Sequence, residues 1–415
     1  MTTISRRIFF RNGGLALVSL GFAPSFLTRT VTAAESGRRK LLIAIFQRGA
    51  MDGLNAVVPF GEKTYYQARP SIAIARPGSG ADAAIDLDGF FGLHPRLAPL
   101  KPFYEARQIA LVHACGSPDS TRSHFDAQDY FETATPGVKS TRDGWLNRYL
   151  QARGAESAEE TAFRAVALAT QLPRALQGPA PALAMNRIAQ FGVRGDAPMG
   201  TSFEAQYKAA ADVVLNGAGR DAFEAIRALK AADPERYQPE RGADYPRSAF
   251  GQALRQIAQL AKADVGLEVA FAESNGWDHH VNEGAATGQL AARLDDIARG
   301  LAALATDLGD RFDDTIILTM SEFGRAVAEN GNRGTDHGHG NAMMVLGGAV
   351  RGGRIYGRWP GLARDQRFEG RDLAITTDFR DVFGEIVVRH LGIADPRAIF
   401  PGYEIKPSRF AGFLR

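Results

Sequence analysis

Residues 315–325 have the sequence TIILTMSEFGR, in which an apolar run is followed at once by Glu322 and Arg325. A short apolar run of this length predicts a buried strand. Between residues 287 and 308, leucine and isoleucine recur every three or four positions, which predicts an amphipathic helix that Thr287 could cap. Strands that alternate with helices favour an α/β fold with a largely parallel sheet covered on both faces. Five further runs predict strands of the same kind: LLIAIF (41–46), IALVHA (109–114), FRAVAL (163–168), LEVAFA (267–272) and AMMVLG (342–347).

Polar side chains with metal-binding or catalytic chemistry lie beside most of these predicted strands. In open α/β sheets, ligands bind beyond the carboxyl ends of the strands. Carboxylate and imidazole groups are the usual ligands of zinc and manganese in proteins. Several loops that carry such groups predict a divalent-metal site at one edge of the sheet. The residues that follow the strands are Asp52, Ser123, His124, Asp278, His280, Glu322 and Arg325.

The stretch GTDHGHGN, residues 334–341, precedes the last predicted strand and contributes Asp336, His337 and His339. Its glycines allow the backbone to bend so that neighbouring side chains can converge. The alternative is a solvated loop in which Asp336 caps a turn. Because other loops carry the same kind of residues, we predict that this loop joins the metal site.

The N-terminus carries a twin-arginine export pattern. SRRIFF (residues 5–10) is followed by a modest apolar run, and VTAA (residues 31–34) offers small residues for cleavage. The apolar run is shorter than the ~20 residues that a spanning helix needs. We therefore predict a signal peptide at residues 1–34, recognition by the twin-arginine export machinery, no stable membrane span, and a mature protein in the periplasm or outside the cell.

Charge and cysteine content exclude several classes of protein. The chain has 49 basic and 46 acidic residues, and residues 1–34 carry four arginines and no acid, so the remainder has a net charge of −1. No basic stripe argues for nucleic-acid binding. Cys115, the single cysteine, excludes an intrachain disulfide and lies in an apolar run where burial is expected.

Five motifs together resemble the DUF1501 family of exported bacterial proteins, and the likeness runs from about residue 40 to the C-terminus. This resemblance implies an alkaline phosphatase-like fold, a three-layer α/β sandwich shared with sulfatases and phosphomutases. We expect one such domain over residues 35–415, with a mostly helical insertion or cap at about 203–262. The motifs are RGAMDGLNAVVPF, RSHFDAQDYFETATPG, GWDHH, SEFGR and GTDHGHGNAMMVLGGAVRGG.

In the wider fold the metal ligands are carboxylates and histidines from successive loops, and a Ser, Thr or modified Cys is the nucleophile. By resemblance, Asp52 matches the first aspartate, and Asp278 with His280 matches an Asp and His of one loop. Glu322 matches the acid of an Asp-His pair. His337 matches the final histidine, with His339 behind it.

Two departures limit the resemblance. Phe323 stands where the Asp-His pair would place its histidine, so a second metal site is weak or missing. The stretch CGSPD (115–119) lacks the spacing of the formylglycine signature, which disfavours a type I sulfatase.

Ser123 is the most plausible nucleophile, although it could instead cap the helix that follows it. His124 is a possible ligand or phosphate donor, and Arg325 could hold an anionic substrate by a bidentate contact. The sequence thus predicts an exported, metal-dependent hydrolase of phosphate or sulfate esters, acting on a small or polymeric anion. The alternative is a non-catalytic periplasmic binding or assembly protein on a degenerate scaffold of the same fold.

Overall fold

The computed structural model describes residues 9–11, 14–16, 39–78, 80–154, 163–188 and 237–415. It divides into two units, Met1–Arg39 and Lys40–Arg415. In the first unit, strands β1 (Phe9–Arg11) and β2 (Gly14–Ala16) pair as an antiparallel ribbon. The fold below is that of the second unit.

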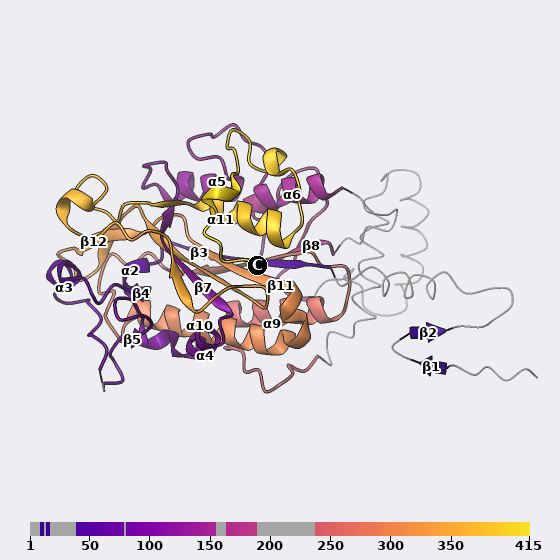
Figure 1. The fold of residues 1–415 in the computed structure, drawn as a ribbon, viewed down its shortest axis with the longest axis horizontal. Helices are drawn as coiled ribbons and strands as arrows, with labels where there is room; N and C mark the ends of the chain where they lie inside the picture. Colours follow the sequence, from indigo (N-terminus) through magenta and orange to yellow (C-terminus); the bar gives the residue numbers. More distant parts are fainter. Residues whose placement is uncertain (1–8, 12–13, 17–38, 79, 155–162, 189–236) are drawn as a thin grey trace, which may run out of the picture. The chain divides into compact units, whose positions relative to one another are not determined.

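A nine-stranded sheet runs through the described part of this unit, in the order β15-β7-β14-β11-β3-β10-β8-β9, with β16 beside β7 (Figure 1). Each of the six predicted strands is present, with bounds that shift by no more than three residues. The strands are β3 (Leu41–Arg48), β7 (Ile109–Gly116), β8 (Ala165–Leu168), β9 (Leu183–Ala184), β10 (Val269–Asn275), β11 (Thr315–Met320), β14 (Asn341–Gly347), β15 (Arg354–Tyr356) and β16 (Thr377–Asp378).

The direction of β14 explains how the GTDHGHGN loop reaches the candidate site. β3 pairs in parallel with both β10 and β11, so these three strands end at one edge of the sheet. β14 is antiparallel to β11 and to β7, so its beginning lies at that same edge. The loop before β14 therefore meets the loops after the parallel strands.

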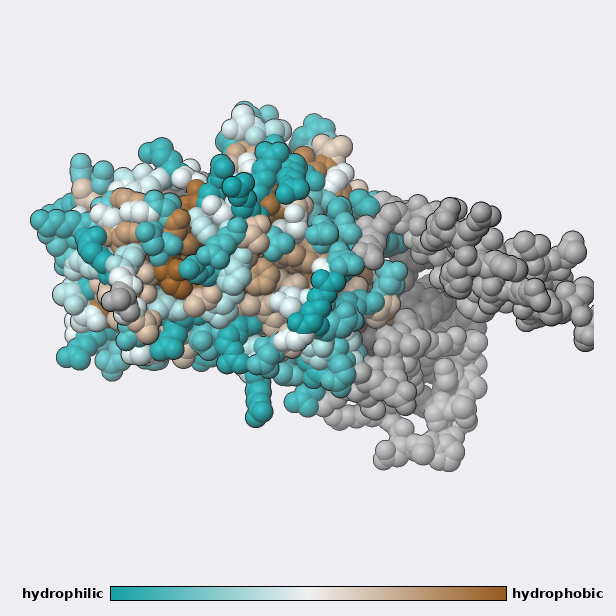
Figure 2. Space-filling model, turned by 60° about the horizontal axis from the view of Figure 1, so that its bottom comes forward, coloured by the Kyte–Doolittle hydropathy of each residue, from teal (hydrophilic) through white to brown (hydrophobic). Residues whose placement is uncertain are grey.

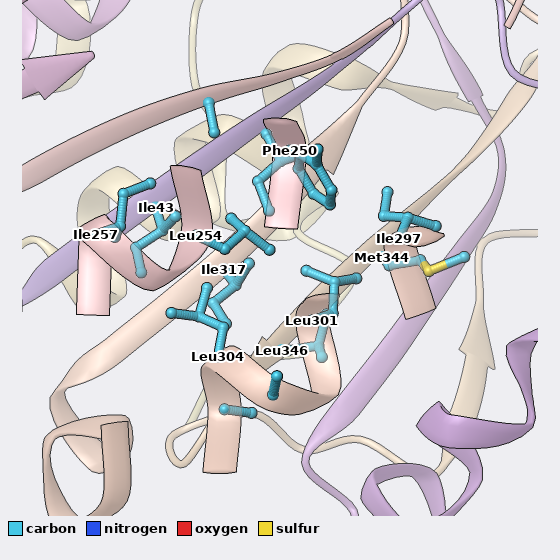
Figure 3. Close-up of a cluster of buried hydrophobic side chains, with 14 of the residues drawn as sticks. Ile43, Phe250, Leu254, Ile257, Ile297, Leu301, Leu304, Ile317, Met344 and Leu346 are labelled. Atoms are coloured by element: carbon cyan, nitrogen blue, oxygen red, sulfur yellow. The ribbon is translucent and has the colours of Figure 1, made fainter. Parts of the chain in front are cut away.

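One face of the sheet is covered by α9 (Ala249–Lys262) and α10 (Gln289–Leu308), with α4 (Lys101–Glu105) beside them (Figure 1). Figure 3 shows Leu254 and Ile257 of α9 and Leu301 of α10 packed against Ile43 and Ile317 of the sheet, all of them buried. The predicted helix is confirmed. Its predicted cap is wrong, because Gly288 is the residue before α10 and no side chain caps it.

The opposite face is covered by α5 (His124–Thr133), α6 (Trp145–Arg153) and α11 (Phe379–Glu385) (Figure 1). Phe131, Trp145 and Phe383 from these helices form a second buried core with Phe46 and Phe271 of the sheet. Two cores on the two faces give three layers, and the predicted α/β sandwich with a largely parallel sheet is confirmed.

Smaller elements surround the loops. An antiparallel pair follows β11, and its register places Arg325 opposite His337. The elements are α2 (Gly53–Ala56), β4 (Val57–Val58), α3 (Lys63–Ala68), β5 (Ile85–Asp86), β6 (Gly92–Leu93), β12 (Arg325–Glu329) and β13 (Thr335–His337).

Hydrophilic residues predominate on the face shown in Figure 2, where hydrophobic residues form limited patches. Among the described residues, no helix is both long and apolar enough to cross a membrane. Of the predicted helical insertion at 203–262, residues 203–236 lie outside the described residues. The later part of that segment contains α9, which belongs to the helical layer on the sheet.

Candidate metal centre

Three side chains converge at the edge of the sheet where β10 and β11 end, one from the start of α5, one from the loop after β10 and one from the end of β13. His124, Asp278 and His337 each offer a ligand atom, and these atoms lie within 4.8 Å of one another. Asp278 Oδ2 is 3.4 Å from His124 Nε2, and Asp278 Oδ1 is 3.2 Å from His337 Nε2. Tetrahedral zinc with bonds of about 2.0–2.1 Å places its ligand atoms roughly 3.3 Å apart. The two distances involve different oxygens of Asp278, so the support for a common metal ion is that one ligand atom from each residue lies within 4.8 Å of the others.

His124 is held in position by a buried carboxylate behind it. Its Nδ1 lies 2.7 Å from Oε1 of Glu322, which also accepts from Gln128 Nε2 at 2.8 Å and from the amide of Gly49 at 2.9 Å. The hydrogen bond to Glu322 raises the pKa of His124, and this effect outweighs the burial that would lower it. Since Nδ1 is bound to a carboxylate, Nε2 is the nitrogen that faces the cluster.

His337 is oriented in the same way by a backbone carbonyl. Its Nδ1 lies 2.8 Å from the carbonyl oxygen of Arg122, which leaves Nε2 directed at Asp278. Burial lowers the pKa of His337, which favours the neutral imidazole that a metal requires. His280 is a fourth polar group, with its Nε2 2.9 Å from His337 Nε2 and 3.0 Å from Asp278 Oδ1.

Asp278 is fixed by Arg325, whose Nη2 is 2.7 Å from Oδ1. Burial opposes ionisation of Asp278, but the hydrogen bond and charge of Arg325 lower its pKa to about 2. Arg325 was expected to hold an anionic substrate, and this expectation is wrong, because its side chain is 1% exposed and its guanidinium donates into the protein. The other acceptors are the carbonyl oxygens of Gly49, Ala50, Trp277 and Thr335.

The glycines of the GTDHGHGN loop are needed for close backbone contact. A Cβ added at Gly334 would lie 2.3 Å from the carbonyl carbon of His280, and one at Gly338 would lie 2.3 Å from the carbonyl carbon of Arg325. Both distances are shorter than a carbon contact allows. Because glycine has no Cβ at these two positions, the loop can lie against the segments that carry His280 and Arg325.

The structure does not bring Asp52 to the cluster. Both of its carboxylate oxygens contact the guanidinium of Arg69, and Oδ1 also accepts from the amide of Leu54 at the start of α2. Burial opposes ionisation of Asp52, but the charge of Arg69 lowers its pKa. Burial and the neighbouring Asp52 raise the pKa of Glu283. The prediction of Asp52 as a ligand is wrong because its carboxylate is paired with Arg69. That residue follows α3, 17 residues along the chain, and no motif marks it.

Three other predicted ligands lie around the cluster. Glu322 stands behind His124, and its Oε2 accepts from Ser321. Asp336 lies at the periphery, with Oδ1 3.6 Å from His280 Nδ1. His339 is buried and stacked on Phe368 with ring centroids 4.0 Å apart, away from the metal-binding group.

Ser123 occupies the N-cap position of α5, where its Oγ accepts from the amide of Asp126 at 3.4 Å. The hydroxyl of Ser123 therefore makes the helix-capping contact that was the alternative to a role as nucleophile. Phe323, which stands where the resemblance would place a histidine, packs its ring 5.0 Å from those of His124 and His337.

One further observation supports a metal ion bound by these residues. His124 Nε2 is buried and forms no hydrogen bond within the described residues, although its ring is firmly held and Oδ2 of Asp278 lies 3.4 Å away. A buried imidazole nitrogen without a partner is costly unless something binds it. Two oriented imidazoles and an ionised carboxylate are a normal zinc-type ligand set that leaves a position open.

Residues 110–395 match the DUF1501 family, which is described as a protein of unknown function. The chain belongs to the DUF1501 family. No curated protein is similar enough in sequence to count as a match.

Two solved structures resemble this DUF1501 protein. The sulfatase PsFucS1 from Pseudoalteromonas sp. has 15% identity, a TM-score of 0.40 and covers 95% of this chain and 78% of its own. The phosphonate monoester hydrolase of Agrobacterium radiobacter has 12% identity and a TM-score of 0.33. The match covers 86% of this chain and 74% of the hydrolase chain. At these TM-scores the likeness does not bear on the activity of this protein.

Gln128 is a site residue that the sequence did not single out. It lies one helical turn after His124, so both side chains reach Glu322 from the same face of α5. That spacing was visible in the sequence. The carbonyl of Arg122 carries no such signal, because any residue has one.

Proposed function

We propose that this DUF1501 protein is a metal-dependent hydrolase of phosphate or sulfate esters. The observation that supports this most is the convergence of His124, Asp278 and His337, each held by a partner outside the cluster. A scaffold that only binds another protein has no need of three metal-type ligands positioned in this way. Preorganised ligands supported by outer hydrogen bonds are typical of functional metal sites.

The side chains of the candidate site have different roles in this proposal. A divalent metal bound here would supply Lewis-acid activation of an ester oxygen and lower the pKa of a bound water. His124, Asp278 and His337 would hold the ion, and Glu322 and Arg325 would keep His124 and Asp278 oriented. His280, at hydrogen-bond distance from both Asp278 and His337, is available to hold or pass a proton.

The anionic group of the substrate needs a positive partner, and Arg371 is a candidate. Its Nη2 donates to the carbonyl of His337 at 2.9 Å, and its side chain is 41% exposed. Its Nη1 is 3.6 Å from Oδ2 of Asp372, a longer ion pair than the 2.7 Å one between Arg325 and Asp278. A half-exposed guanidinium directly behind a ligand histidine can reach a phosphate or sulfate oxygen.

The test is metal content together with turnover. The purified protein is analysed for bound metals by mass spectrometry and then assayed, with the metal found, on aryl phosphate mono- and diesters and aryl sulfates. Bound metal and turnover that disappears on chelation and returns on metal addition support the proposal. Wild type that holds no metal and hydrolyses no ester would leave the non-catalytic binding or assembly protein as the better description.

Phe323 is the observation that favours this second function. It fills the space beside His124 and His337 where the wider fold has another ligand, and packs with Ala50 and Ala127. Within the described residues a single group of potential ligands is found. The non-catalytic function is therefore the better description if this one group binds no metal.

We also propose that the protein is exported by the twin-arginine route, as the pattern at residues 5–10 and 31–34 suggests. Replacing Arg6 and Arg7 with lysine should leave the precursor in the cytoplasm, because this route recognises the paired arginines. Cell fractionation with an antibody to the protein measures this. Normal processing of the double variant would exclude the route.

A further inference from the structure

The large apolar side chains that face solvent belong to segments next to the candidate metal centre. Among the described residues, three are exposed: Phe125 (90%), Val281 (50%) and Val138 (45%). Single exposed apolar residues are ordinary on a protein surface. A phenyl ring that is almost wholly exposed is less so, and the position of all three next to one site calls for a reason.

Chain connectivity places each of them. Phe125 directly follows His124, and Val281 directly follows His280. Val138 precedes Lys139, whose Nζ lies 2.8 Å from Oδ1 of Asp126, the residue after Phe125. We call Phe125, Val138 and Val281 the apolar rim.

Packing of the fold does not require Phe125. The buried apolar residues of α5 are Ala127, Tyr130 and Phe131, and Phe125 is not among them. A polar residue at this position would serve the helix equally well. The side chain therefore has a role outside the folded core.

The size of the rim selects among its possible occupants. A stable protein–protein interface buries about 800 Å² on each partner, whereas an aromatic side chain buries roughly 150–250 Å². One phenyl ring and two valines suit a small apolar group. The group of His124, Asp278 and His337 suits the anionic end of an ester. One ester with an apolar part and an anionic part would therefore contact the apolar rim and the candidate metal centre together.

We propose that the apolar rim is a binding subsite for the aryl or alkyl part of an anionic ester whose phosphate or sulfate group reaches His124 and Asp278. This inference rests on the proposed function and deepens it by naming the substrate class. Phe125 provides most of the contact area. Val138 and Val281 border it from the loops after α5 and after β10.

Alkylphosphonates test the rim without turnover, because their carbon–phosphorus bond resists hydrolysis by such a site. Binding of methyl-, butyl- and octylphosphonate to the metal-loaded protein is measured by calorimetry. In wild type, affinity should rise about two- to fourfold for each methylene in contact with the rim. In Phe125→Ser this rise should be largely lost while methylphosphonate binds as before. Phe410→Ser, at a half-buried phenyl in the C-terminal segment, is the control and should keep the rise.

The outcomes are distinct. Methylphosphonate binding without any gain along the series, or the same gain in Phe125→Ser, overturns the rim and leaves the proposed function standing. Failure of all three phosphonates to bind, with no ester hydrolysed, overturns both. A wild-type dimer that Phe125→Ser makes monomeric by light scattering, or vesicle binding that the variant loses, would assign the rim to a second copy or to a lipid surface and overturn the proposal.

Discussion

Glu322 and His124 form the buried contact on which the candidate site depends. Oε1 of Glu322 lies 2.7 Å from Nδ1 of His124, and the carboxylate is enclosed except for the donors that hydrogen-bond to it. The hydrogen bonds from His124 and Gln128 lower the pKa of Glu322 despite its burial. A charged acceptor behind a ligand imidazole fixes the tautomer and increases the basicity of the other nitrogen.

Glu322→Gln should weaken metal binding by about 10- to 100-fold while the protein stays folded, because the amide keeps a hydrogen-bond acceptor but removes the charge. Competition with a chromophoric chelator measures the affinity. Glu329→Gln is the matched control, since that carboxylate hydrogen-bonds Ser71 at a surface turn. Equal affinities of Glu322→Gln and wild type would show that Glu322 has no influence on the metal.

Asp278 and Asp52 should respond oppositely to the same substitution. Asp278→Asn removes a partly exposed ligand charge, so metal content should fall. It also removes the ion-pair partner of buried Arg325, but that guanidinium keeps four backbone carbonyl acceptors, so the metal-free protein should lose less stability than Asp52→Asn. Asp52→Asn leaves Arg69 buried without its counter-charge, which should cost about 3–5 kcal/mol of stability and spare the metal. Metal analysis and chemical unfolding of both variants check this. Loss of metal in a well-folded Asp52→Asn protein would restore Asp52 as a ligand.

Ser123→Ala should retain metal and most turnover and lose on the order of 1 kcal/mol of stability, because the hydroxyl caps α5. Single-turnover assays with an aryl ester and urea unfolding measure the two effects. Turnover abolished in a variant with full metal content would instead identify Ser123 as the nucleophile.

The strands and the loops beside them could be predicted because buried parallel strands are continuous apolar runs and sites form where these strands end. The direction of β14 could not be predicted, since an apolar run of seven residues has the same composition in either direction. The different roles of Asp278 and Asp52 could not be predicted either. Both are acids after a strand, and both form an ion pair with a buried arginine. Arg69 contacts both carboxylate oxygens of Asp52, whereas Arg325 contacts Oδ1 of Asp278 and Oδ2 lies near His124. Likewise, Glu322 and Arg325 were found as site residues, but their roles depend on which groups their side chains touch.

Acid should destabilise the protein through histidines remote from the metal centre, and His113 in β7 is the clearest case. Its Nε2 lies 3.0 Å from the carbonyl oxygen of Val57, and its Nδ1 accepts from the amide of Ala114. Burial lowers its pKa from 6.5 to about 4, although the negative charge of Asp52 opposes this. Protonation of Nδ1 would also replace its hydrogen bond from the amide of Ala114 with a repulsive contact between two N–H groups.

Because the folded-state pKa of His113 is below the unfolded one, the unfolded chain takes up a proton first as the pH falls. The stabilising contribution is complete above about pH 6.5 and is lost as the pH falls towards 4, at up to about 1.4 kcal/mol per pH unit for one proton. His113→Gln should be less stable than wild type at pH 7.5 but should lose stability less steeply over this interval. Urea unfolding between pH 7.5 and 4.5 measures the slopes. Val112→Ala, a buried and non-titrating change in the same strand, should lower stability without altering the slope, whereas equal slopes for wild type and His113→Gln would show that His113 does not contribute to acid sensitivity.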